Sequence, residues 1–69
     1  MQARVLAALE GVPLDRRSVL IMHDINGISA PDISVALSIP LNTVYSRVRV
    51  AREEFRGALR REQLRGGER

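Results

Sequence analysis

Hydrogen-bonding and basic side chains gather in one segment of the chain, residues 37–52, which reads LSIPLNTVYSRVRVAR. Its polar and basic side chains are Asn42, Thr43, Tyr45, Ser46, Arg47, Arg49 and Arg52. No acidic residue interrupts the segment, and the first one after it is Glu53. Amide, hydroxyl and guanidinium groups bond base edges and phosphates. A surface needed only for solubility would mix acids with bases. The segment therefore favours contact with nucleic acid over simple solvation, although an isolated arginine-rich helix face is often only solvated.

The apolar residues of the same segment recur with the period of a helix. At about 100° per residue, Val44, Val48, Ala51 and Phe55 lie within roughly 60° of one another and form its buried stripe. The exposed side of the first two turns then carries Asn42, Thr43, Tyr45, Ser46 and Arg47. One shoulder continues toward the C-terminus with Arg49, Arg52 and Arg56. We expect the first two turns to meet base edges and the later arginines to meet phosphate.

Three further helices are expected before this one. Apolar spacing and turn residues predict helices over residues 2–10, 14–25 and 30–37, with the fourth over 41–61. Gly11 ends the first, Pro13 suits the start of the second, and Gly27 is a natural left-handed end for it. Ser29 and Asp32 form a capping pattern that starts the third. The predicted fold is therefore all-α, a four-helix domain with a long basic C-terminal recognition helix.

The third and fourth segments have the spacing of a helix-turn-helix. A short helix, the break Ser38-Ile39-Pro40 and a longer basic helix follow in that order. Ser34 stands where the two helices would cross, and Val44 would plug the crossing from the fourth helix. The predicted core consists of Leu9, Leu20, Ile25, Ile33, Leu37, Val44, Val48 and Phe55. Residues 1–61 form the expected domain, and residues 62–69 form a charged tail that we expect to be flexible.

Composition narrows the function classes. The chain has 69 residues, a net charge of +3 and no cysteine. Residues 1–40 hold three arginines and four acidic residues, whereas residues 41–69 hold eight arginines and four acidic residues. No apolar run approaches the length of a membrane span. His23 is the only histidine, so no metal site is expected, nor a cofactor or catalytic site. A cytoplasmic monomer is the expected form.

The stretch GVPLDRRSVLIMHDINGISAPDISVALSIPLNTVYSRVRVAREEF resembles region 4 of extracytoplasmic-function (ECF) sigma factors, most specifically in PLNTVYSRVRVAR. The resemblance runs from Leu9 to about Arg61. It implies a helix-turn-helix domain that recognises the minus-35 promoter element in double-stranded DNA. It also implies docking on the flap of the RNA polymerase core and masking by an anti-sigma factor. Four positions depart from the family pattern, namely Ser34, Ser38, Asn42 and Tyr45.

Carried over by position, the resemblance places six residues on the DNA-reading surface and two more at the phosphates. The first six are Asn42, Thr43, Tyr45, Ser46, Arg47 and Arg49, and the other two are Arg52 and Arg56. Two alternatives stay open from the sequence. The sequence is also compatible with a protein-interaction module for RNA polymerase or an anti-sigma factor, and with the DNA-binding output domain of a response regulator. Arg16 and Arg17 belong either to a solvated first turn or to a phosphate contact.

Overall fold

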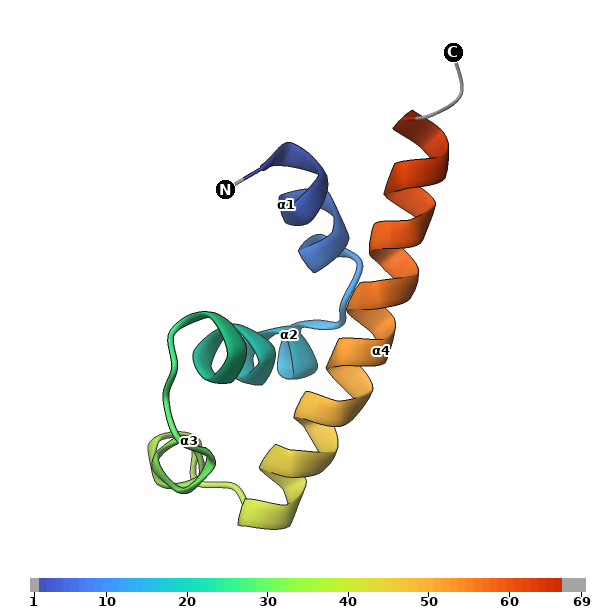
Figure 1. Cartoon of the computed structure of the whole chain (residues 1–69). Helices are drawn as coiled ribbons and strands as arrows, with labels where there is room; N and C mark the ends of the chain where they lie inside the picture. The colour runs from blue at the N-terminus through green and yellow to red at the C-terminus, as the bar shows by residue number, and fades with distance from the viewer. Residues whose placement is uncertain (1, 67–69) are drawn as a thin grey trace.

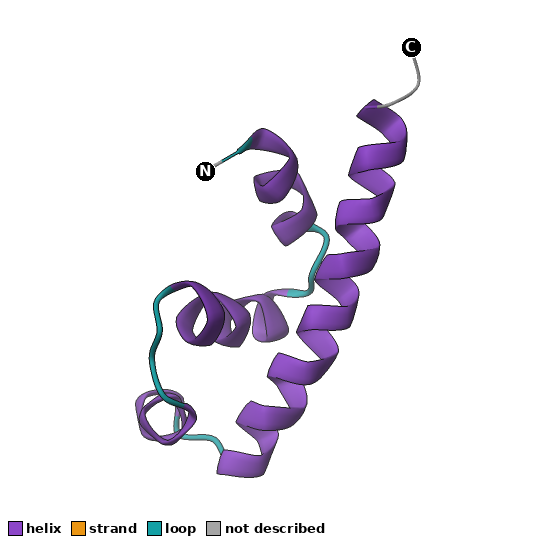
Figure 2. Ribbon diagram, in the orientation of Figure 1, coloured by secondary structure: helices purple, strands orange, loops and turns teal. Residues whose placement is uncertain are grey.

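The computed structural model describes residues 2–66, in which every regular element is a helix (Figures 1 and 2). The elements are α1 (Ala3–Glu10), α2 (Leu14–Leu20), the π-helical turn η1 (Ile21–Ile25), α3 (Ala30–Leu37) and α4 (Leu41–Gly66). Helices α1, α2 and α3 each contact α4. Figure 1 shows them succeeding one another along it, with α3 next to its first turns and α1 beside its C-terminal half. The all-α prediction with a helix-turn-helix is confirmed.

Local sequence accounts for the start of α3 and the loop before it. The Ser29 hydroxyl accepts a hydrogen bond from the Asp32 backbone N–H at 3.2 Å, and a proline occupies the first turn. Gly27 has a φ of 72°, a conformation that side chains with a Cβ rarely adopt. The α2–η1 segment ends as a π-helix because the Asn26 N–H bonds the Ile21 carbonyl, five residues back, at 2.9 Å.

Two apolar clusters hold the helices together. One joins α2, α3 and the start of α4, and consists of Val19, Ala30, Ile33, Val44 and Val48. The other joins α1, α2 and the middle of α4, and consists of Leu9, Val12, Leu20 and Ala51. Because the two clusters lie along successive parts of α4, they fix both its tilt and its rotation relative to the preceding helices.

Five of the eight predicted core residues are buried, two are exposed and one is half-buried. Ile25 is 48% exposed because it ends the π-helical turn, at the edge of an open groove. Leu37 is 39% exposed, and Ile39 instead packs against the cluster beneath the turn. Phe55 is only half-buried. The prediction that Ile25 and Leu37 lie in the core is therefore wrong.

The turn between α3 and α4 is held by the two serines that depart from the family pattern. Ser38 adopts a left-handed conformation with φ 57° and ψ 45°. The Ser34 hydroxyl donates a hydrogen bond to the Ile39 carbonyl, and the Ile39 N–H donates to the Ser34 carbonyl at 3.1 Å. Ser34 thus connects α3 to Ile39, which lies in the turn before α4.

Helix α4 continues further than the sequence predicted, to Gly66 rather than about Arg61. Residues 58–64, ALRREQL, are mostly strong helix formers, so nothing in them ends the helix. Arg65 also pairs with Glu62 at 2.6 Å, one helical turn earlier. The predicted flexible tail therefore begins inside α4, and residues 67–69 lie outside the described residues. None of the helices in residues 2–66 is long and apolar enough to cross a membrane.

Candidate DNA-binding surface

The first two turns of α4 present the polar side chains predicted from the sequence. Val44 and Val48 are 0% and 4% exposed, so the opposite side of the helix faces outward. Asn42, Tyr45, Ser46 and Arg49 are exposed, and Thr43 and Arg47 are half-buried on the flank. The helix starts at the turn, where the Pro40 carbonyl accepts hydrogen bonds from the Thr43 and Val44 N–H groups at 3.0 and 3.2 Å. The structure thus brings these six residues together on one surface at the end of α4 next to α3.

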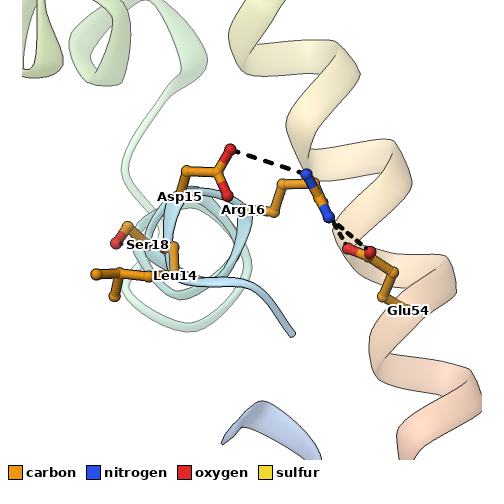
Figure 3. Close-up of polar contacts among 5 residues, drawn as sticks. All are labelled: Leu14, Asp15, Arg16, Ser18 and Glu54. Carbon is orange, nitrogen blue, oxygen red and sulfur yellow. Dashed lines mark hydrogen bonds and ion pairs between the residues drawn. The ribbon is translucent and has the colours of Figure 1, made fainter. Parts of the chain in front are cut away.

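An ion pair that the sequence reading missed locks α4 against α2 on one side. Arg16 Nε and Nη2 donate to Glu54 Oε1 and Oε2 at 2.7 and 2.8 Å (Figure 3). This hydrogen bonding lowers the pKa of Glu54. Asp15 lies at 3.8 Å from the same guanidinium, and the Arg17 Nε donates to the Val12 carbonyl at 3.1 Å. Both arginines of this turn are therefore engaged within the fold.

A second pair locks the other side and involves a predicted phosphate contact. Arg52 Nε and Nη2 donate to Asp24 Oδ2 and Oδ1, both at 2.7 Å. His23 Nδ1 lies 2.8 Å from Asp24 Oδ1. The hydrogen bond from Arg52 is the main cause that lowers the pKa of Asp24 to about 2. Arg52 is therefore tied to η1, although its side chain remains 51% exposed.

The other predicted arginines stand apart from such pairs. Among the described residues, Arg47, Arg49 and Arg56 take part in no ion pair within 4.0 Å. Arg49 and Arg56 are exposed, while Arg47 is half-buried at the side of the helix. Their guanidinium groups are available to an anionic partner without the loss of an internal ion pair.

An apolar groove of about 420 Å³ lies between α1, the α2–η1 segment and α4. Its apolar lining comes from Val5, Leu9, Leu20, Ile25 and Phe55, and its charged rim from Asp24, Arg52 and Arg56. The sequence analysis placed four of the lining residues in the core, namely Leu9, Leu20, Ile25 and Phe55, and missed the groove.

Comparison with known proteins agrees with the geometry. The family model described as "Sigma-70, region 4" matches residues 2–55. The chain is 35% identical over 57 residues to the ECF RNA polymerase sigma factor SigE of Mycolicibacterium smegmatis. That match covers 83% of this chain and 22% of the relative, so the chain spans about a fifth of that protein's length. No solved structure matches the chain. With a family match over most of its length and a helix-turn-helix in the matched region, the chain belongs to the sigma-70 region 4 family.

Proposed function

We propose that this chain is the promoter-reading domain of an ECF sigma factor and recognises the minus-35 element in double-stranded DNA. The observation that carries the proposal is the acid-free outer surface of the first two turns of α4, held outward by buried Val44 and Val48. In a helix-turn-helix these turns enter the major groove. Family membership supports the same role, since region 4 is the part of a sigma factor that binds the minus-35 element.

Within this surface the roles divide by position along α4. Ser46 and Arg47, in the second turn, supply base-edge contacts, and arginine is well suited to guanine O6 and N7. Asn42, Thr43, Tyr45 and Arg49 surround them at the groove. Arg56 lies about 13 Å further along the axis from Arg47 and meets the phosphates at the groove rim.

A binding selection on random duplexes tests the proposal. The 69-residue chain is incubated with the duplex pool at low salt, and the enriched sequence is then compared with a shuffled duplex of equal composition. We expect tighter binding to the enriched duplex and a loss of that preference in the Ser46→Ala/Arg47→Ala double variant. Equal affinity of the unmodified chain for both duplexes would refute sequence recognition.

The apolar groove favours a second role, docking on the RNA polymerase core. Ile25 is 48% exposed at its edge, and charged residues rim it, which suits an amphipathic partner segment. The variant Ile25→Gln should weaken binding to core polymerase and leave DNA affinity unchanged. Leu14→Gln is the matched control, because Leu14 is 69% exposed on α2 and lies outside the groove. Equal effects of both variants on polymerase binding would show that the groove is not the docking site. If Ile25→Gln weakened binding to an anti-sigma factor alone, the groove would be assigned to that partner instead.

A further inference from the structure

One arginine of the candidate DNA-binding surface is already neutralised within the fold. Arg52 lies on the same shoulder of α4 as Arg49 and Arg56, yet both Nε and Nη2 bond the two oxygens of Asp24 at 2.7 Å. The pair spans 28 residues of sequence and joins η1 to α4. Among the described residues, the other arginines of that surface, Arg47, Arg49 and Arg56, form no such pair.

The chemistry of the pair bears directly on phosphate binding. Two-point bonding to a carboxylate uses the edge of the guanidinium that would also fit a phosphate. An arginine that already carries a carboxylate adds no net positive charge to the surface, so it releases no counterion when DNA approaches. Exposed ion pairs contribute little to stability, and Arg52 is 51% exposed, so a phosphate is able to compete for it.

We propose that Asp24 withholds Arg52 from DNA, and that Arg52 transfers from the Asp24 carboxylate to a backbone phosphate when the domain engages its site. This inference rests on the proposed DNA-binding function. Asp24 thereby limits affinity and the steepness of the salt dependence without touching DNA. His23, whose Nδ1 lies on the same carboxylate at 2.8 Å, remains as a partner for Asp24 after Arg52 has left.

The test compares charge-matched variants on the enriched and shuffled duplexes. Asp24→Asn removes the carboxylate that holds Arg52. Asp15→Asn is the control, since it removes one negative charge from α2 and leaves Arg16 doubly bonded to Glu54. Each substitution is also made in an Arg52→Gln background, and circular dichroism confirms that every variant is folded at the assay temperature.

We expect Asp24→Asn to bind both duplexes more tightly at low salt and to steepen the log–log salt slope by about 0.9. Between 50 and 200 mM salt its advantage should shrink by about 3.5-fold, which is that slope over a fourfold range. Both effects should vanish in the Arg52→Gln background. Equal behaviour of Asp24→Asn and Asp15→Asn would overturn the proposal. Weaker binding by folded Asp24→Asn would overturn it too, because Asp24 would then hold Arg52 in place for phosphate.

A measurement on the unmodified chain covers the case in which Asp24→Asn does not fold. The Nε–H resonance of Arg52 should shift when duplex DNA is added, while that of Arg16, similarly bonded to Glu54, should stay in place. An unmoved Arg52 resonance would overturn the proposal. Failure of the unmodified chain to prefer the enriched duplex would instead refute the proposed function, so the two failures are distinguishable.

Discussion

Ser38 occupies a backbone conformation that favours glycine. Its φ of 57° and ψ of 45° place it in the left-handed region, which costs a residue with a Cβ about 1–2 kcal/mol. Replacement by glycine removes that strain but increases the entropy of the unfolded chain. We expect Ser38→Gly to raise the free energy of unfolding by about 0.5–1 kcal/mol in urea denaturation. Gly27→Ala, at φ 72°, should lower it by about 1 kcal/mol. A less stable Ser38→Gly protein would show that the serine side chain matters more than the strain.

Substitutions at Arg47 and Arg56 should distinguish base recognition from phosphate contact. Arg47→Ala should lose about 1–3 kcal/mol on the enriched duplex and relax discrimination at one base pair. Arg56→Ala should weaken binding to all duplexes by a similar factor and flatten the salt slope by about one unit. Matched and single-mismatch duplexes at two salt concentrations provide the measurement. An equal loss on every duplex for Arg47→Ala would place the base-reading residues elsewhere.

Asp24 should stabilise the fold only at pH values at which its carboxyl group is ionised. Its folded pKa is about 2, below the ordinary 3.8, so its stabilisation is complete above the unfolded value and is lost as pH falls from about 4 toward 2. Because the ion pair is partly exposed, we expect a contribution of about 1 kcal/mol. Urea denaturation of the parent and Asp24→Asn at pH 6 and pH 2.5 measures it. The difference between the two proteins should be smaller at pH 2.5, and a constant difference would argue against the pair.

The surface residues were predictable from the sequence, whereas their partners were not. The helical period places Asn42, Ser46 and Arg49 opposite Val44 without knowledge of the rest of the chain. The Arg16–Glu54 pair, by contrast, joins residues 38 positions apart, and Arg52–Asp24 joins residues 28 apart. Such contacts depend on how two helices cross, and local periodicity carries no information about that crossing.

The observed helix bounds agree closely with those predicted from local sequence. The differences arise where contacts between helices determine the structure. Caps and breakers placed α3 at Ala30–Leu37, as predicted. No cap or breaker in the sequence predicts the π-helical turn of η1, so the exposure of Ile25 was missed. Gly66 rather than Arg61 ends the described part of α4, because helix formers continue past the last packed turn.

Val44 packs in the cluster that joins α3 to α4. It is 0% exposed and lies in one cluster with Ile33 and Val19. Val44→Asp buries an unpaired charge there and should cost several kcal/mol or unfold the chain. Val35→Asp is the matched control, since Val35 is 81% exposed on α3 and its replacement should change stability by less than about 0.5 kcal/mol. Equal thermal midpoints for the parent and Val44→Asp would contradict the burial of Val44 between α3 and α4.

The described chain is elongated, with extents of 46 × 19 × 14 Å, because α4 runs past all three preceding helices (Figure 1). The candidate DNA-binding surface lies at the α3 end, while the apolar groove opens between α1, η1 and the middle of α4. Arg52 and Arg56 belong to both, since they line the groove and stand on the shoulder of α4 that continues from that surface. If both proposed roles hold, DNA and a protein partner would occupy different parts of one long helix.

The same length should divide the basic residues of α4 into those that contact DNA and those that do not. Arg60 follows Asn42 by 18 residues, about 27 Å along the helix axis, whereas the major groove is roughly 12 Å wide. Binding should therefore fall steeply with salt, but Arg60 and Arg61 should contribute little to the slope. We expect the Arg60→Gln/Arg61→Gln variant to keep its affinity for the enriched duplex within about twofold and its slope unchanged. If both arginines met phosphate, the slope would flatten by about 1.8 units, and the far end of α4 would have to be included in the DNA-binding surface.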